Sequence, residues 1–142
     1  MADDPGEALV RRYYEEALNP GRFDRLDDLL TNEFVDHEEL RGIPPTREGL
    51  KQKYTMLRAG FPDFGFTIED LFGADDRVAV RVTVRGTHEG EFMGIPATGR
   101  TATVEAWFID RYREGTFVES RIIMDVAGLL GQLGVLPGAK DA

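Results

Sequence analysis

The feature of this sequence that most constrains its fold is a change in the spacing of apolar residues after residue 62. Before that point, over residues 9–17 for example, apolar side chains recur every three or four residues, which is the spacing of an amphipathic helix. After it, over residues 78–84, they recur at every second residue, which is the spacing of a strand with one buried face. Helices in the first part of the chain and strands in the second predict an α+β fold.

Three helices are expected in the first part, over residues 5–18, 23–30 and 47–60. The first follows an acidic N-cap residue and has proline at its first position, and Thr46 can cap the third. A short strand over residues 33–38 lies between the second helix and the third. Each helix has an apolar face, so we expect the three to pack on one side of a sheet.

The second part reads as a meander of strands that ends in a short helix or helical turn. Strands are expected near residues 64–69, 78–85, 101–113 and 116–125. Hairpin connections join them, so the sheet is expected to be antiparallel and strongly curved. The sequence has no repeat, linker or low-complexity segment, and residues 1–142 are therefore expected to form a single domain.

Composition excludes several classes of function. The formal net charge is −9, which would repel nucleic acid and anionic membranes. There is no cysteine, so disulfides, thiolate catalysis and cysteine-based metal sites are excluded. No apolar run approaches the roughly 20 residues that span a bilayer, and the acidic N-terminus is unlike a signal peptide. We therefore expect a cytoplasmic protein with no nucleic-acid or membrane partner.

One acidic residue, Asp125, lies inside the apolar stretch RIIMDVAGLLGQLG at residues 121–134. The spacing of the last strand does not decide which of its faces points inward. If Asp125 points inward, burial raises the pKa of its carboxyl, as in carboxylates that transfer protons at neutral pH. Alternatively, Asp125 caps a terminal helix that begins at Val126.

The chain has two histidines, and each allows two interpretations. His88 is in phase with the apolar face of the 78–85 strand, where it can orient or polarise a substrate, or it is an exposed hairpin residue. His37 and Asp36 point to opposite faces of their strand, so only one of them can line a cavity. No HxH or HExxH spacing is present, and we expect no metal site.

Aromatic residues are abundant and are expected to form mostly core. A subset would line any pocket for a flat apolar ligand, and the candidates are Tyr14, Tyr54, Phe61 and Trp107. The phosphate-binding patterns GxGxxG and the P-loop are missing, as is the GxSxG pattern of hydrolases. A nucleotide site and a serine nucleophile of that type are therefore not expected.

Several short motifs in the second half occur in the order typical of one family. They are Gly-Thr-His at 86–88, Gly-Ile-Pro-x-Thr-Gly-Arg at 94–100, Arg-Tyr-x-x-Gly at 111–115, and an aspartate followed by Gly-Leu-Leu-x-Gln-Leu-Gly at 128–134. With this ordered set the chain resembles the SnoaL-like polyketide cyclases of the nuclear transport factor 2-like superfamily. The resemblance covers nearly the whole chain.

The resemblance implies a cone-shaped, curved antiparallel sheet that wraps around three N-terminal helices and encloses a deep apolar pocket. It implies a small apolar ligand, polycyclic or of polyketide type, and homodimers or homotetramers built through the outer face of the sheet. It also implies chemistry without a metal or an organic cofactor. In such cyclases, an aspartate that matches Asp125 is the acid/base of an intramolecular aldol closure, and a histidine that matches His88 helps to polarise a carbonyl group.

The chain departs from the family pattern at two neighbouring positions of the last strand. Family members often read Glu-His-Trp where this chain reads Glu119-Ser120-Arg121. Arg121 either enters the pocket, where it can anchor a carboxylate or phenolate of the substrate, or forms a surface or interface charge. The expected substrate-binding residues are Tyr14, His37, Tyr54, Phe61, Trp107 and Arg121.

The fold that the resemblance implies also carries other activities. The same scaffold hosts isomerases, dehydratases, epoxide hydrolases and tailoring hydroxylation factors. It can also serve as a non-catalytic module that binds a small ligand, because a fold does not determine a function. An aldol-type cyclase is the leading expectation.

Overall fold

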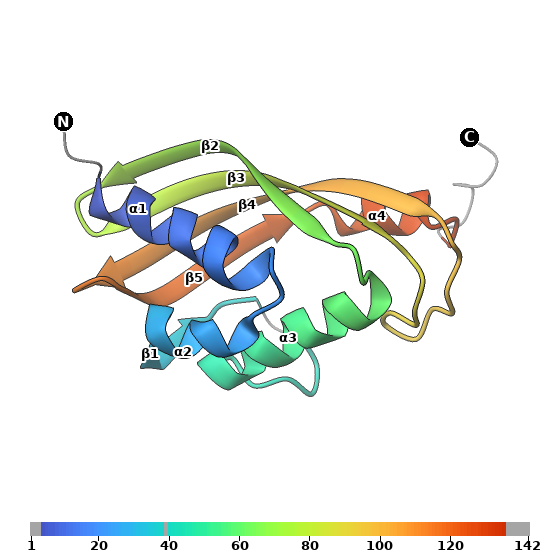
Figure 1. Cartoon of the computed structure of the whole chain (residues 1–142), viewed down its shortest axis with the longest axis horizontal. Coiled ribbons are helices and arrows are strands. Elements are labelled where there is room, and N and C mark those ends of the chain that lie inside the picture. The colour runs from blue at the N-terminus through green and yellow to red at the C-terminus, as the bar shows by residue number, and fades with distance from the viewer. Residues whose placement is uncertain (1–3, 39, 136–142) are drawn as a thin grey trace.

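The two spacings in the sequence become two layers of structure (Figure 1). The computed structural model describes residues 4–38 and 40–135. The first half contains α1 (Pro5–Arg12), the π-helical turn η1 (Tyr13–Leu18), the 3₁₀ turn η2 (Phe23–Arg25), α2 (Leu26–Leu29), β1 (Leu30–Asp36) and α3 (Arg47–Gly60). The second half contains β2 (Gly65–Ala74), β3 (Arg77–Thr87), β4 (Thr101–Arg113), β5 (Thr116–Met124) and α4 (Val126–Gln132).

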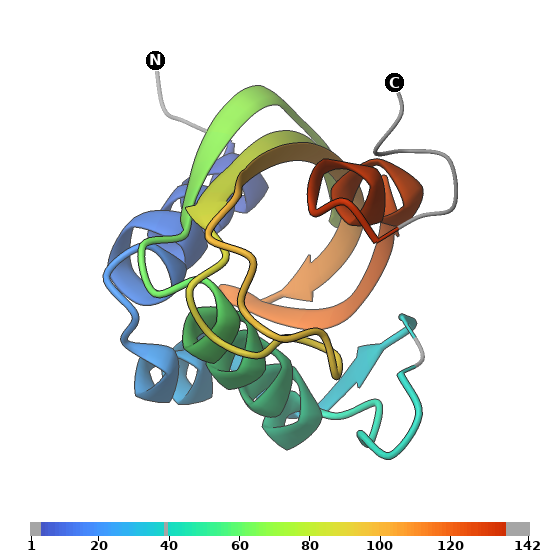
Figure 2. The ribbon, with the colours of Figure 1, turned by 90° about the vertical axis from the view of Figure 1, so that its right-hand side faces the viewer.

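The sheet has five strands in the order β1-β5-β4-β3-β2, and it is curved but not closed (Figure 2). Strands β2 to β5 pair antiparallel, as the hairpin connections predict. Register shifts between Ile68 and Asp70 on β2 and between Arg111 and Tyr112 on β4 increase the local bend, as β-bulges do. The predicted α+β class is confirmed.

The sheet has one parallel pair that the sequence did not predict. β1 runs parallel to β5, with Val35 opposite Glu119 and Asp36 opposite Ser120. β1 follows the short α2 helix and joins the edge formed by the last strand, far away in the sequence. Turn residues in the sequence predict pairing only between strands that follow each other in the chain, so they could not predict the pairing of β1 with β5.

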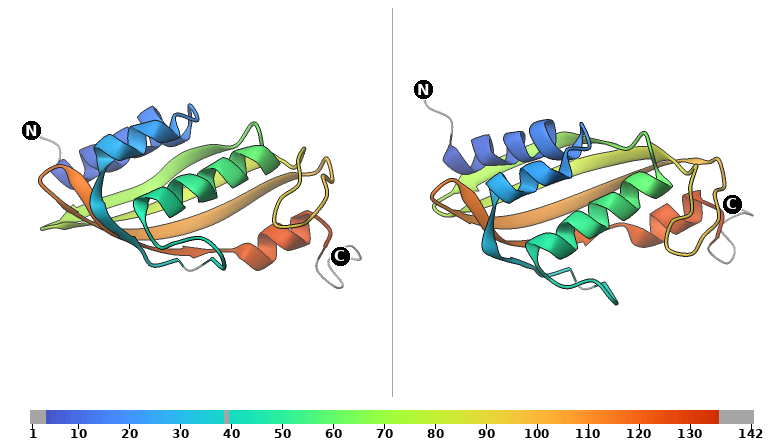
Figure 3. Two further views of the ribbon diagram at one scale, coloured as in Figure 1. Left: turned by 90° about the horizontal axis from the view of Figure 1, so that it is seen from below. Right: turned by 60° about the horizontal axis from the view of Figure 1, so that its bottom comes forward.

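The helices cover the concave face of the sheet, with α3 lying along it below α1 (Figure 3). The predicted caps are present, since Asp4 accepts hydrogen bonds from the amides of Gly6 and Glu7, and Thr46 accepts one from Gly49. The first helix changes from α to π at Tyr13, where the Asn19 amide donates to the Tyr14 carbonyl at 2.9 Å. Turns of this kind are often found at functional sites.

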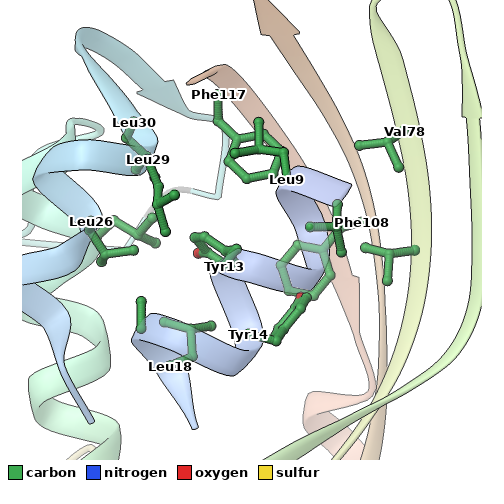
Figure 4. Close-up of a cluster of buried hydrophobic side chains, with 14 of the residues drawn as sticks. Leu9, Tyr13, Tyr14, Leu18, Leu26, Leu29, Leu30, Val78, Phe108 and Phe117 are labelled. Atoms are coloured by element: carbon green, nitrogen blue, oxygen red, sulfur yellow. The ribbon is translucent and has the colours of Figure 1, made fainter. Parts of the chain in front are cut away.

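The core lies between the helices and the inner face of the sheet (Figure 4). Tyr13 and Tyr14, at the start of η1, point in different directions within it. The Tyr13 ring packs edge-on against Phe117 at 5.5 Å between centroids, and the Tyr14 ring lies 5.2 Å from Phe66. A second cluster fills the end of the molecule where α4 packs, formed by Phe61, Phe64, Ala102, Val104, Leu129 and Leu133.

Within residues 4–38 and 40–135, no helix is both long and apolar enough to cross a lipid bilayer.

Candidate active site

A cavity of about 500 Å³ lies between α3, the inner face of β2 to β5, the loop over residues 88–100 and α4. Most of its wall is apolar, with contributions from Leu50, Leu57, Phe61, Phe66, Val84, Phe92, Val104, Phe108, Ile122 and Leu129. Met56, Met93 and Val126 also line the cavity and are exposed, so they mark its mouth. A site of this size and character suits a flat apolar ligand.

The loop at the mouth is fixed to the end of α3. The amides of Glu89 and Gly90 both donate to the carbonyl of Gly60, at 3.0 and 3.1 Å. A Cβ atom at Gly90 would lie 2.1 Å from the carbonyl oxygen of Ala59, so only glycine allows this close approach. The loop thereby holds Phe92 over the cavity, against the ring of Phe61.

Polar side chains gather on one wall of the cavity, which we call the polar wall: Tyr13, Asp36, Lys53, Tyr54 and Ser120. Four elements contribute to it, namely η1, the end of β1, α3 and β5. Since Lys53 and Tyr54 are neighbours on α3, and Asp36 pairs with Ser120 across the sheet, these groups lie close together. The polar wall is the part of the cavity that can do chemistry.

Asp36 and Lys53 form a buried ion pair in the polar wall. The Lys53 Nζ lies 2.8 Å from Oδ2 of Asp36, and it also donates to the backbone carbonyl and to the carboxylate of Glu38. The backbone amide of Glu38 donates to the other oxygen of Asp36 at 3.0 Å. These bonds fix the position of the carboxylate, and its remaining lone pairs stay available to a ligand.

Two buried tyrosines complete the polar wall. The hydroxyl oxygens of Tyr13 and Tyr54 lie 3.0 Å apart and form a hydrogen bond. Burial raises the pKa of both phenols, so both stay protonated at neutral pH. Because two hydroxyls carry two hydrogens and this bond uses one, the other hydrogen can be donated to a carbonyl oxygen in the cavity.

Asp110 lies behind the polar wall, on the inner face of β4 and directly opposite Ser120. Burial raises the pKa of the Asp110 carboxyl to about 7; a hydrogen bond from Ser120 opposes this rise, and the charge of Asp36 adds to it. A small hollow of about 10 Å³ separates the carboxyl from the cavity, and Tyr13, Phe108 and Ser120 line both spaces.

The structure places Asp125 outside the cavity lining. Its side chain is exposed, and Oδ1 accepts a hydrogen bond from the amide of Gly128 at 2.8 Å. This is the capping geometry that the sequence offered as the alternative to an inward orientation. The inward orientation is therefore wrong for this structure, because strand β5 ends at Met124 and the carboxylate turns to the first turn of α4. The proton-transfer role of Asp125 stays a prediction.

His88 is fully buried but does not line the cavity. Its ring stacks on Phe61 at 5.2 Å between centroids, and Phe61 forms the wall. The Thr98 amide donates to Nδ1 at 3.3 Å, which places the hydrogen of a neutral ring on Nε2. Nε2 is buried and makes no hydrogen bond within the described residues. The exposed-hairpin interpretation of His88 is wrong, since Thr98 and Phe61 cover the ring.

Three other candidates lie on the outer side of the sheet. Arg121 is exposed and pairs with Glu119 at 3.2 Å, so it does not enter the cavity. His37 contacts the same carboxylate at 3.3 Å, and it is Asp36 that lines the cavity instead. Trp107 is 59% exposed and its indole donates to Glu105. The strand alternation puts all three on the outer face.

Of the expected substrate-binding residues, the cavity brings together Tyr54 and Phe61. Tyr14 is buried in the core and is not part of the lining. Lys53, Ser120 and Asp110 were not expected at the site. A signal for Asp110 was available, because along β4 it occupies the same alternating face as five apolar residues: Ala102, Val104, Ala106, Phe108 and Tyr112.

The described part of the chain has no group of three or more histidine, aspartate or glutamate side chains arranged to hold a metal ion. The cavity lining has two carboxylate-bearing residues near one another, Asp36 of the polar wall and Glu38, and the Lys53 ammonium group bonds to both.

The sequence profile of the SnoaL-like polyketide cyclase family matches residues 8–133. Two relatives are the aklanonic acid methyl ester cyclases DauD of Streptomyces sp. (strain C5) and DnrD of Streptomyces peucetius, each 29% identical to this chain and matched over 89% of it. These matches cover 80% of DauD and 88% of DnrD.

Solved structures agree with this match. TsrD from Streptomyces laurentii superposes with a TM-score of 0.85 at 27% identity, over 96% of this chain and 99% of TsrD. IdmH from Streptomyces antibioticus superposes with a TM-score of 0.80 at 35% identity, over 94% of this chain and 100% of IdmH. From its sequence, its curved sheet and its apolar cavity, the chain belongs to the SnoaL-like polyketide cyclase family.

Proposed function

We propose that this chain is a cofactor-free polyketide cyclase-type enzyme. It would close a ring on an aromatic polyketide, or a similar apolar carbonyl compound, by acid/base-catalysed aldol condensation or related proton transfer. The observation that carries the proposal is the polar wall inside an otherwise apolar cavity. An aldol closure needs a base and hydrogen-bond donors, and the polar wall contains both. The names of DauD and DnrD point to a substrate of the same class.

The roles of the polar wall follow from its chemistry. Asp36 takes a proton from a carbon between two carbonyl groups, and such a proton is acidic enough for a carboxylate base. The tyrosine hydroxyl pair donates a hydrogen bond to the enolate oxygen that forms, and burial strengthens this bond. The enolate carbon then attacks a second carbonyl group. The oxygen of that carbonyl carries the negative charge and needs a proton.

Ring closure of aklanonic acid methyl ester, followed by chromatography and NMR, tests the proposal. The wild-type chain is expected to form the ring-closed isomer. Asp36→Asn is expected to lose about 10²-fold or more of the rate, the usual contribution of a positioned base. Glu33→Gln changes an exposed carboxylate on the same strand and should keep the rate. Equal rates for Asp36→Asn and wild type would exclude Asp36 as the base.

A non-catalytic ligand-binding module is the second candidate. The observation that favours it is the exposure of Asp125, the residue that the sequence resemblance marks as the acid/base. A module of this kind would bind the same ester without forming product. Calorimetric binding together with an absence of ring closure by the wild-type chain would therefore select this candidate over the enzyme.

We also propose a second copy of the chain as a partner. The outer face of the sheet carries an exposed apolar patch, which we call the outer patch: Phe72, Trp107, Ile109 and Ile123. Trp107 pairs with Ile123 across β4 and β5, and Ile109 lies two residues from Trp107 on the same face of β4. Phe72 on β2 lies in the same cross-strand row as Ile109, with Ala79 of β3 between them. Arg81, with Asp70 and Glu105, borders the outer patch with charges of both signs. A two-fold contact can place such opposite charges against each other.

A further inference from the structure

A row of three polar residues crosses three neighbouring strands at the polar wall. Asp36 on β1 lies opposite Ser120 on β5, and Ser120 lies opposite Asp110 on β4. Residues opposite each other on paired strands point to the same face of the sheet, with Cβ atoms about 5 Å apart. The Ser120 hydroxyl therefore stands between two carboxyl groups, and Ser120 also lines the cavity.

The two carboxyl groups of this row have different surroundings. Asp36 has the Lys53 ammonium group at 2.8 Å and a backbone amide on its other oxygen. Asp110 has no cation in ion-pair contact within the described residues. Where two carboxyl groups of one site differ in this way, one is suited to act as a base and the other as an acid.

No positively charged side chain among the described residues pairs with the Asp110 carboxyl. On the helical side its neighbours are Tyr13, Tyr14 and Tyr54, which are uncharged at neutral pH. The Lys53 ammonium group is bound to Asp36 and Glu38. From the strands, Asp36 brings a negative charge, Ser120 a hydroxyl, and Val78 on β3 only an apolar side chain. Phe34, Phe108 and Phe117 close the hollow around it.

The path from Asp110 to the cavity leads through Ser120. The hollow beside Asp110 has about 10 Å³, roughly the space of one water molecule, and no ligand could enter it. Asp110 is absent from the cavity lining, whereas Tyr13, Phe108 and Ser120 border both spaces. Of the two hydroxyl groups among them, that of Ser120 forms a hydrogen bond with the Asp110 carboxyl, and that of Tyr13 pairs with Tyr54. Asp110 can therefore exchange a proton with a bound ligand only through a hydroxyl group or a single water.

We propose, building on the cyclase-type function above, that Asp110 holds a proton behind the polar wall and delivers it through the Ser120 hydroxyl to the substrate oxygen, while Asp36 takes the proton from the substrate carbon. The C–H bond breaks and its proton goes to Asp36, the new carbon–carbon bond forms, and the resulting alkoxide takes the Ser120 hydrogen as Asp110 replaces it. The proton on Asp36 then returns to Asp110 through Ser120, which restores the starting state.

Asp110 acts through Ser120 in this scheme, so it is a positioning residue for the proton. Its pKa of about 7, raised by burial, agrees with a carboxyl that both holds and releases a proton near neutrality. A carboxyl with an ordinary pKa near 3.8 would be ionised there and could donate nothing.

The first test follows the Asp110 carboxyl carbon by NMR as the pH is varied, with no substrate present. We expect a midpoint near pH 7 in the wild-type chain, assigned by its loss in Asp110→Asn. Ser120→Ala should raise the midpoint because the carboxylate loses a donor, and Asp36→Asn should lower it because a negative neighbour is removed. Glu33→Gln should leave it unchanged. A midpoint near 4, or one that does not respond to Ser120→Ala, overturns the proposal.

The second test separates the two proton transfers in the ring-closure assay. Asp110→Asn and Ser120→Ala should keep the exchange of the substrate α-proton with deuterium, which needs Asp36, and lose about 10²-fold of ring closure. Ser120→Thr retains a hydroxyl and should recover most of the rate. Ring closure at the wild-type rate in Asp110→Asn overturns the proposal. If the wild-type chain closes no ring, both the proposed function and the proton delivery are wrong. The NMR titration tests separately whether Asp110 holds a proton near neutral pH.

Discussion

The carboxylate of Asp36 and the ammonium group of Lys53 lie 2.8 Å apart in the wall of the cavity, with each side chain at least nine-tenths buried. The pair joins the end of β1 to α3, and the Lys53 ammonium group also donates a hydrogen bond to the backbone carbonyl of Glu38. The contact therefore sets both the position of the proposed base and the local charge at the polar wall. Its removal should affect stability and chemistry together.

Lys53→Met is predicted to destabilise the protein by about 3–5 kcal/mol, because it leaves the Asp36 carboxylate buried without its cation. The double variant Asp36→Asn/Lys53→Met removes both charges and should be less destabilised than the single one. Unfolding in urea, analysed as a double-mutant cycle, measures the difference. A loss below about 1 kcal/mol for Lys53→Met would mean that the pair behaves as a solvent-exposed one.

The raised pKa of Asp110 predicts a pH-dependent contribution to stability. The folded chain binds this proton more tightly than the unfolded chain, so the contribution is complete below the ordinary value near 3.8 and is lost as the pH rises through about 7. The shift of about three units corresponds to roughly 4 kcal/mol. Asp110→Asn removes this dependence, so its stability relative to wild type should rise between pH 4 and pH 8.

Comparison of the two proteins isolates this contribution. Asp27, Asp63 and Glu119 have lowered pKa values from hydrogen bonds with Lys51, Thr87 and His37, and they act in the opposite direction. Because these groups are present in both proteins, they cancel in the difference. A difference in unfolding free energy that stays constant with pH would contradict the raised pKa of Asp110.

Asp125→Ala is predicted to lower stability by about 1 kcal/mol, because the Gly128 amide loses the side chain that caps α4. Asp125→Asn keeps a capping oxygen and should be close to wild type in thermal unfolding. Neither change should slow ring closure beyond its effect on folding. If Asp125→Asn is as stable as wild type but loses ring closure, Asp125 is the acid/base that the family resemblance implies.

Ile123→Glu is predicted to separate a dimer built on the outer patch, because it puts a charge at the centre of an apolar contact opposite Trp107. Light scattering after size-exclusion chromatography measures the mass of the assembly. The wild-type chain should elute as a dimer or a tetramer and the variant as a smaller species. A monomeric wild-type chain, or a variant of unchanged mass, would contradict the proposed partner.

Local sequence signals predicted the elements well. The helical spacing and the N-cap at Thr46 predicted α3, which spans Arg47–Gly60, and strict alternation predicted β4 at Thr101–Arg113. These signals come from backbone hydrogen bonding and from the contrast between a buried and an exposed face, and both act within a few residues. The change of spacing near residue 62 predicted the α+β class for the same reason.

Sequence reasoning was less successful for the site because the cavity residues come from distant segments. It placed Asp125 at the site through the ordered motifs, whereas the end of β5 turns that side chain out to cap α4. Two residues of the last strand differ from the family pattern: Ser120 lines the cavity, and Arg121 lies outside it. Strand alternation separates such neighbours, but only the covering helices decide which face becomes the inside.

Local patterns in the sequence were enough to predict the order of helices and strands, the alternating faces of β3 and β4, and the caps that begin the helices. The tertiary fold, in contrast, brings β1 beside β5 and thereby places Asp36, Ser120 and Asp110 in one row. It also decided that Lys53 pairs with the first carboxylate of this row and not with the second. The reason is physical: burial and charge pairing depend on which elements meet in space, and these quantities set the pKa values on which the proposed chemistry depends.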